Sequence, residues 1–168
     1  MGTISSFLDS RPDLLPLLKA LERFEICGEF LLTELGHGLD ARNLETTATL
    51  QTDGSFVLHT QHAGAAKTMP PSSPHAGMRR TVVFARLMVD GKDHGVRPVV
   101  VPLNDASGAT SPGVSCTLFP ARPGAKAIDH SLTTFTHLRL PAEALLGNLH
   151  GLLEDERRAF LHALPLYK

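Results

Sequence analysis

The stretch Thr33-Glu34-Leu35-Gly36-His37-Gly38, with the segment Leu44-Glu45-Thr46-Thr47-Ala48-Thr49 that follows it, decides the fold of this chain. The first stretch begins as a strand and the second ends as one. Gly36 and Gly38 flank a single histidine, and a backbone without Cβ atoms lets a bound group approach closely. We therefore expect a ligand site in this turn, where donors, acceptors and charges converge from Thr33, Glu34, His37, Asp40 and Arg42.

The composition is that of an ordinary globular domain. The chain has 168 residues, of which 42% are apolar and 20% charged, and this length is sufficient for one domain with its own core. We expect a single domain over residues 1–168. Lys and Arg together number 16 against 17 for Asp and Glu, so the charge balance predicts neither a nucleic-acid partner nor an anionic membrane surface.

The two cysteines and the N-terminal sequence both suggest that the protein is in a reducing cellular compartment. Cys27 and Cys116 lie in apolar, strand-like contexts, and we expect both to be buried free thiols. No basic and apolar N-terminal stretch indicates a signal peptide, and no apolar run reaches the ~20 residues that a membrane span needs. The sequence therefore predicts a cytoplasmic protein.

One helix is expected at each end of the chain. In residues 12–24, leucines recur with the spacing of one helical face, at Leu14, Leu17, Leu18 and Leu21. Residues 149–164 carry a similar apolar stripe, with charged residues between its members. The region between these helices, residues 26–147, has the pattern of strands and turns.

That central region predicts an all-β fold. Ile26–Thr33 is the first expected strand, and 45–60 is an expected hairpin around the Asp53-Gly54 turn. Residues 61–80 hold three prolines and little periodicity, which is typical of a long functional loop. Further strands are expected at Thr81–Val89, Val96–Leu103, Val114–Phe119 and Leu132–Leu140. Six or seven mostly antiparallel strands at this spacing predict a β-barrel or sandwich.

Several of these motifs resemble the middle β-domain of the acyl-CoA oxidase and acyl-CoA dehydrogenase family. The resemblance begins with the two stretches quoted first and covers roughly residues 24–150. It continues through Phe56-Val57-Leu58-His59-Thr60, Val83-Phe84-Ala85-Arg86-Leu87, Val101-Pro102-Leu103, Pro112-Gly113-Val114 and Leu138-Arg139-Leu140-Pro141-Ala142-Glu143-Ala144-Leu145-Leu146. The resemblance implies an antiparallel β-barrel, flanked here by the N-terminal and C-terminal helices.

The family resemblance also implies a flavin site. Its members have a helical domain before the barrel and a helical bundle after it, and FAD lies between barrel and bundle. At the matching positions, Thr33 and the segment from Gly36 to Gly38 would touch the flavin ring. The catalytic glutamate of the family comes from the bundle, and with the chain ending at Lys168 we expect that bundle to be missing.

One segment departs from the family pattern. After the lysine that corresponds to Lys67, acyl-CoA oxidases carry Trp-Trp-Pro-Gly-Gly against the flavin. Here the residues are Thr68-Met69-Pro70-Pro71-Ser72, and the chain contains no tryptophan. We therefore expect no cofactor, with bound FAD as the alternative.

These observations lead to three functional hypotheses. The first is a cofactor-independent enzyme that cyclises an apolar, polyketide-like or polyene substrate in the emptied cleft, as in a Diels–Alder-type closure. The second is an FAD-binding oxidase-like subunit completed by a partner chain, and the third is a binding module without chemistry. For the first hypothesis we expect catalytic roles for His37, Arg42 and Lys67 and substrate contacts from Thr33, Glu34, Gly36, Gly38 and Met69.

Simpler roles remain open for several of these residues. His37 could bond only to backbone, and Arg42 could form an ion pair with Asp40 or Glu45. No metal site is expected, because the histidine pairs His59/His62 and His130/His137 have no carboxylate or cysteine at a metal-binding spacing. Helix faces without their family partners predict a homodimer.

Overall fold

The computed structural model describes residues 1–72, 77–120, 123–124 and 129–147. Its N-terminal part is helical: a short helix α1 (Gly2–Ser5) is followed by a 3₁₀ turn (Pro12–Leu14) and helix α2 (Leu15–Glu22). The expected helix over 12–24 therefore begins as a 3₁₀ turn and ends two residues early. The expected C-terminal helix over 149–164 lies outside the described residues.

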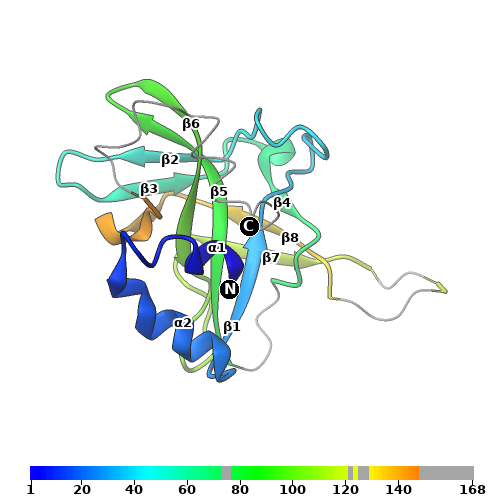
Figure 1. Cartoon of the computed structure of the whole chain (residues 1–168). Coiled ribbons are helices and arrows are strands. Elements are labelled where there is room, and N and C mark those ends of the chain that lie inside the picture. Colours follow the sequence, from blue (N-terminus) through cyan, green and yellow to red (C-terminus); the bar gives the residue numbers. More distant parts are fainter. Residues whose placement is uncertain (73–76, 121–122, 125–128, 148–168) are drawn as a thin grey trace.

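The larger of two sheets is curled into a half-barrel (Figure 1). Its central strand β5 (Met78–Val89) pairs antiparallel with β6 (Lys92–Pro102) around the Asp90-Gly91 turn. The other strands of this sheet are β1 (Ile26–Leu31), β2 (Thr47–Leu50), β3 (Phe56–His59) and β9 (Leu138–Leu140). The hairpin expected over 45–60 is confirmed by the antiparallel pairing of β2 with β3.

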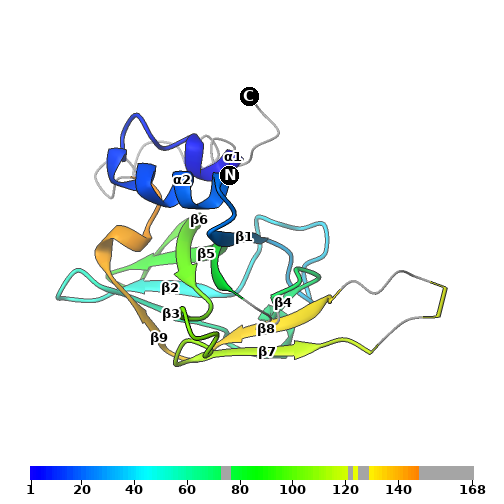
Figure 2. The ribbon, with the colours of Figure 1, turned by 90° about the horizontal axis from the view of Figure 1, so that it is seen from below.

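The smaller sheet has three strands in the order β4–β8–β7. These are β4 (Lys67–Thr68), β7 (Val114–Leu118) and β8 (Ser131–Phe135). Figure 2 shows it on the side of the large sheet opposite to α1 and α2. The long loop expected over 61–80 thus contains a 3₁₀ turn (Ala63–Ala65), the strand β4 and the start of β5.

The expected antiparallel barrel is wrong in two respects. Strands β1 and β2 both run parallel to β5, β1 along residues 78–83 and β2 along 86–88. They follow one another along the same edge of β5, because the turn between them returns the chain to its original direction. The described strands form a half-barrel and a small sheet rather than one closed barrel.

The single strand expected over Leu132–Leu140 is also wrong, because the chain breaks at Thr136 and His137. His137 has a φ of +48°, and the Thr136 amide donates to the Gly113 carbonyl oxygen at 2.7 Å. This turn moves the chain out of the small sheet, so that β9 pairs with β3 in the large one.

Two apolar clusters occupy the two faces of the large sheet. On β5, Val83 and Ala85 belong to the inner cluster between the sheets, whereas Val82 and Phe84 belong to the outer one. This alternation follows from the two-residue period of a strand. The N-terminal segment that carries helices α1 and α2 covers the outer cluster (Figure 2), mainly through Ile4, Phe7, Leu14, Leu18 and Leu21.

The cysteine expectation is wrong for Cys27, which is exposed on the edge strand β1, while Cys116 on β7 is partly buried. Within the described part of the chain, no helix is long and apolar enough to cross a membrane.

Candidate functional site

The quoted turn is anchored by a buried ion pair between Glu34 and Lys67. Lys67 Nζ lies 2.8 Å from Glu34 Oε1, and both side chains are fully buried. The ammonium also donates to the carbonyl oxygens of Phe84 at 2.6 Å and Leu32 at 3.1 Å. Three acceptors for its three hydrogens leave Lys67 without a donor for a ligand.

The Glu34 carboxylate is equally occupied. Its Oε2 accepts the Glu45 amide at 2.7 Å, and Oε1 accepts the Thr46 amide at 2.9 Å in addition to Lys67. Thr46 then donates its hydroxyl to the Ala65 carbonyl oxygen at 2.7 Å. The pair therefore joins β4, β5 and the entry to β2, and it stabilises the turn as a structural unit.

Burial and the neighbouring carboxylate shift the pKa of Lys67 in opposite directions. Desolvation lowers the pKa of Lys67 to about 8, and the neighbouring Glu34 carboxylate partly opposes that shift. With the ammonium hydrogen-bonded on all sides, Lys67 is charged at neutral pH. Its geometry is that of a buried salt bridge and not of a free base.

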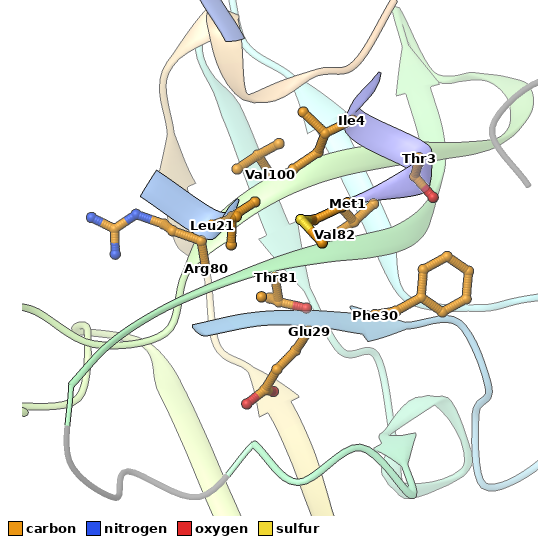
Figure 3. Close-up of a pocket in the computed structure, with 11 residues that line it drawn as sticks. Met1, Thr3, Ile4, Leu21, Glu29, Phe30, Arg80, Thr81, Val82 and Val100 are labelled. Atoms are coloured by element: carbon orange, nitrogen blue, oxygen red, sulfur yellow. The ribbon is translucent and has the colours of Figure 1, made fainter. Parts of the chain in front are cut away.

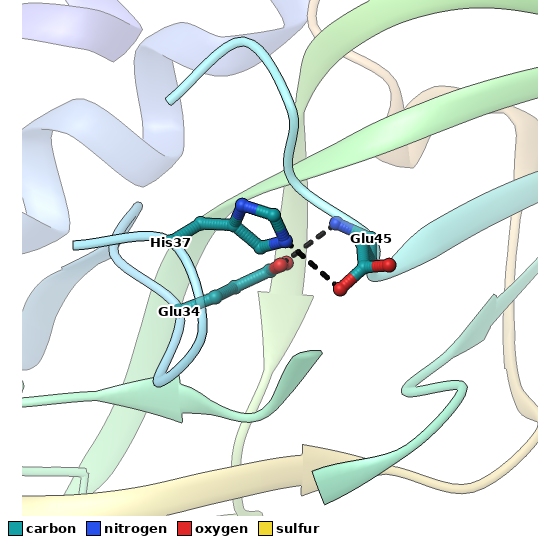
Figure 4. Close-up of side chains that lie close together, drawn as sticks. All are labelled: Glu34, His37 and Glu45. Carbon is teal, nitrogen blue, oxygen red and sulfur yellow. Dashed lines mark hydrogen bonds and ion pairs between the residues drawn. The ribbon is translucent and has the colours of Figure 1, made fainter. Parts of the chain in front are cut away.

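Above this anchor, one carboxylate oxygen of Glu45 contacts two histidines. Figure 4 shows its contact with His37. Glu45 Oε2 lies 2.9 Å from His37 Nε2 and 3.2 Å from His62 Nε2. On the other side of the His37 ring, Nδ1 lies 4.0 Å from Asp40 Oδ2. The hydrogen bond from His37, together with the second histidine, lowers the pKa of Glu45.

The remaining predicted site residues differ in burial and in their hydrogen-bond partners. Arg42 is exposed, and no described residue forms an ion pair with its guanidinium; its carbonyl oxygen accepts from Arg86 at 2.9 Å. Thr33 is partly buried, and its carbonyl oxygen accepts the Thr68 amide at 3.0 Å. Met69 is half exposed, with a φ of +81°. Of the three residues expected to be catalytic, Lys67 is fully buried, His37 is partly exposed and Arg42 is exposed.

An exposed apolar rim follows the turn instead. Leu35 is 57% exposed, Leu39 is fully exposed and Met69 is 50% exposed. Gly36 and Gly38 are exposed between the two leucines, and a Cβ on Gly38 would meet nothing within 4 Å. Large apolar side chains at such positions are typical of a surface that binds a ligand or another chain.

A cavity of about 110 Å³ lies elsewhere, between the N-terminal helices and the outer face of β1, β5 and β6 (Figure 3). Leu21 of α2 approaches Gly28 so closely that a Cβ there would lie 2.8 Å from Leu21 Cδ2. In Figure 3 the Glu29 carboxylate and the Arg80 guanidinium both point away from the apolar side chains that line the cavity: Ile4, Leu21, Val82 and Val100. None of the residues expected to bind substrate lines this cavity.

Sequence reasoning missed Glu45 and His62 as members of the candidate site. In the sequence, Glu45 is part of a strand motif and an ion-pair candidate for Arg42, and His62 has no carboxylate or cysteine at a metal-binding spacing. They are 17 positions apart, and only the folded turn brings them together. The signal available beforehand was the polar cluster around His37, which the structure extends to these two residues.

No family model matches the chain. Curated relatives do: the chain is 40% identical over 121 residues to acyl-coenzyme A oxidase 3 of Yarrowia lipolytica, which is 71% of this chain and 17% of the oxidase. It is 38% identical over 122 residues to an acyl-coenzyme A oxidase of Debaryomyces hansenii, again 17% of that protein. This chain belongs to the acyl-CoA oxidase family through one domain-sized region.

Solved acyl-CoA oxidase structures support the same assignment. The crystal structure of Yarrowia lipolytica acyl-CoA oxidase 3 matches 87% of this chain with a TM-score of 0.77 and 36% identity. A Caenorhabditis elegans acyl-CoA oxidase-2 structure, described as bound with FAD, ascaroside-CoA and ATP, matches 86% with a TM-score of 0.69 and 29% identity. The chain spans only 21–22% of these two oxidase chains. The predicted family is therefore confirmed for a domain-sized part of an acyl-CoA oxidase.

Proposed function

We propose that this chain is the flavin-facing β-domain of an acyl-CoA oxidase-type assembly, with the rest of the active site supplied by a partner chain. One observation carries the proposal: the Thr33–Gly38 turn, held rigid by a buried ion pair, presents an exposed apolar rim in a chain that matches acyl-CoA oxidases. A rigid support of this kind is what a cofactor site requires.

The residues of the rim fit a flat, partly apolar ring. Leu35 and Met69 offer exposed apolar surface, and the hydroxyl of Thr33 forms no hydrogen bond with the described residues, so that it is available as a donor. The glycines keep the rim open to close approach. A bound flavin would supply the electron acceptor for oxidation of an acyl thioester; this chain would supply packing surface and a hydrogen bond.

The segment after Lys67 predicts weaker binding than in the matched oxidases. Met69 is the exposed apolar side chain where the family has a tryptophan pair, whereas Thr68 and Ser72 are buried. Loss of an aromatic stacking surface lowers affinity without removing the site. We therefore expect flavin to bind measurably only when a partner surface covers the rim.

The experiment is a chimera. The matching region of Yarrowia lipolytica acyl-CoA oxidase 3 is replaced by this chain, and the flavin content of the purified protein is measured by absorption. We expect flavin to be retained and to be lost when Leu35→Asp or Met69→Asp is introduced. Leu118→Asp, at an exposed position on β7, is the matched control and should leave flavin content unchanged. A folded chimera without flavin, or one insensitive to both rim variants, would contradict the proposal.

The cofactor-independent cyclase has less support. That hypothesis requires His37, Arg42 and Lys67 to face one open cleft, whereas Lys67 is enclosed by three oxygen acceptors and Arg42 is on the surface. The relatives and solved structures described above are acyl-CoA oxidases. The homodimer remains a prediction, for which light scattering of the purified chain is the test.

A further inference from the structure

We propose that His37, Glu45 and His62 form a surface site for a divalent transition metal ion of the zinc type. Two imidazole nitrogens and one carboxylate oxygen are a ligand set that suits zinc, and three protein ligands leave a fourth position for water. This proposal is independent of the flavin proposal, because it rests only on the geometry of these three side chains.

The distances between the ligand atoms are close to those required. Glu45 Oε2 lies 2.9 Å from His37 Nε2 and 3.2 Å from His62 Nε2. Ligands at ~2.1 Å from a tetrahedral ion are about 3.4 Å apart, and both contacts of Glu45 Oε2 are near that value. His62 falls outside the described group of ligand atoms that lie within 4.8 Å of one another, so its exposed side chain must move toward His37 to close the site around an ion. All three side chains reach solvent, with exposed fractions of 22% for His37, 42% for Glu45 and 53% for His62.

The three backbones that carry these ligands are braced against one another. The Gly36 amide donates to the Gly64 carbonyl oxygen at 2.8 Å, which joins the His37 turn to the His62 turn. A Cβ on Gly36 would lie 3.2 Å from that same oxygen, so glycine permits this close approach. The Glu45 amide is fixed by the buried Glu34 carboxylate. Such bracing lowers the entropy cost of assembling a metal site.

Glu34 also lies near His37 and Glu45, and its ligand atom is within 4.8 Å of theirs. We assign Glu34 a supporting role and not a ligand role, because its oxygens already accept hydrogen bonds from Lys67, Glu45 and Thr46. Asp40 Oδ2 lies 4.0 Å from His37 Nδ1, beyond hydrogen-bond distance, and would have to move closer to accept from this nitrogen as carboxylates do behind zinc-bound histidines.

Zinc binding through His62 Nε2 requires a proton to move from one ring nitrogen to the other. His62 Nδ1 accepts the Gly64 amide at 3.2 Å, so in the metal-free chain the proton of a neutral His62 is on Nε2, directed at Glu45. Metal binding at Nε2 requires that proton to move to Nδ1, and the exposed Gly64 amide then bonds to water instead.

The test is calorimetric titration of the full chain with zinc chloride, in a Cys27→Ser background that removes the exposed thiol as a competing ligand. We expect one zinc ion per chain, and cobalt(II) bound in its place should give the visible absorption of a tetrahedral site. Glu45→Gln, His37→Ala and His62→Ala should each weaken binding at least ~10-fold, since even residues behind the ligands contribute 10–100-fold.

His94→Ala is the matched control, because His94 is a partly exposed histidine on β6 in no described ion pair. Its affinity should equal that of the parent. Glu45→Gln retains an acceptor for both histidines, and its unchanged melting temperature without zinc would show that the turn still folds. Absence of stoichiometric binding, equal loss in His94→Ala, or binding that survives His62→Ala would each overturn the assignment.

Discussion

Glu34 and Lys67 form an ion pair of 2.8 Å in which neither side chain is exposed. Removing one member of such a pair leaves an uncompensated charge in a dry environment, which costs about 3–5 kcal/mol. We therefore expect Lys67→Met to reduce the free energy of unfolding by about that amount. The Glu34→Gln/Lys67→Met double variant should recover part of the loss. Guanidinium denaturation measures both, and additive losses in the double variant would show that the two residues act separately.

Lys67 also predicts a pH dependence in the alkaline range. Burial lowers its pKa from 10.5 to about 8 in the folded chain, so between pH 8 and 10.5 the unfolded chain binds more protons than the folded one. The contribution of this residue to stability should therefore rise with pH across that window. Denaturation curves at about pH 8 and pH 10, compared with those of the double variant, isolate this contribution. A difference that falls with pH would contradict it.

Two glycines give a matched pair of backbone predictions. Gly113 has a φ of +85°, and an added Cβ would lie 2.8 Å from the Thr136 carbonyl oxygen, whereas a Cβ on Gly38 meets nothing within 4 Å. Gly113→Ala should cost about 1–3 kcal/mol, because it combines backbone strain with a clash against main chain. Gly38→Ala should change stability by less than about 0.5 kcal/mol. Thermal melts of the two variants test this directly.

The two thiols should differ in reactivity. Cys27 is exposed on an edge strand, whereas Cys116 is partly buried, donates to the Ser72 carbonyl oxygen at 2.9 Å and has its pKa raised by burial. With a thiol reagent at pH 7.5 we expect one fast and one slow phase. Cys27→Ser should remove the fast phase alone; a fast phase that survives this change would show that Cys116 is accessible.

Local patterns in the sequence predicted most of the individual elements. The leucine spacing in 12–24, the Asp53-Gly54 hairpin and the strand patterns at 81–89 and 96–103 all depend on residues close together in the chain, and the structure shows these elements. The parallel pairing of β1 and β2 with β5 depends on contacts between distant residues, which periodicity does not encode. The break in the strand at His137 depends on the hydrogen bond from the Thr136 amide to the Gly113 carbonyl oxygen. This is again a contact between distant residues, which local patterns do not encode.

The polar cluster at the turn around His37 differs in composition from the one that the sequence predicted. The turn around His37 is where polar groups gather, as expected. Lys67, however, was expected to act on a substrate, and an isolated lysine in a polar loop gives no sign that it will be enclosed with Glu34. Glu45 and His62 become partners only because the backbones at Gly36 and Gly64 meet.

The two oxygens of the Glu34 carboxylate accept hydrogen bonds from the main-chain amides of Glu45 and Thr46 at the entry to β2. In most sheets such amides donate to a neighbouring strand. These two hydrogen bonds do not involve the connecting residues 38–43. A polypeptide cut at the solvent-facing Leu39 would still carry complementary halves, one with the acceptor and one with the donors. Such a break point makes this small domain suitable for splitting into two pieces that reassociate, and for carrying new termini on its surface.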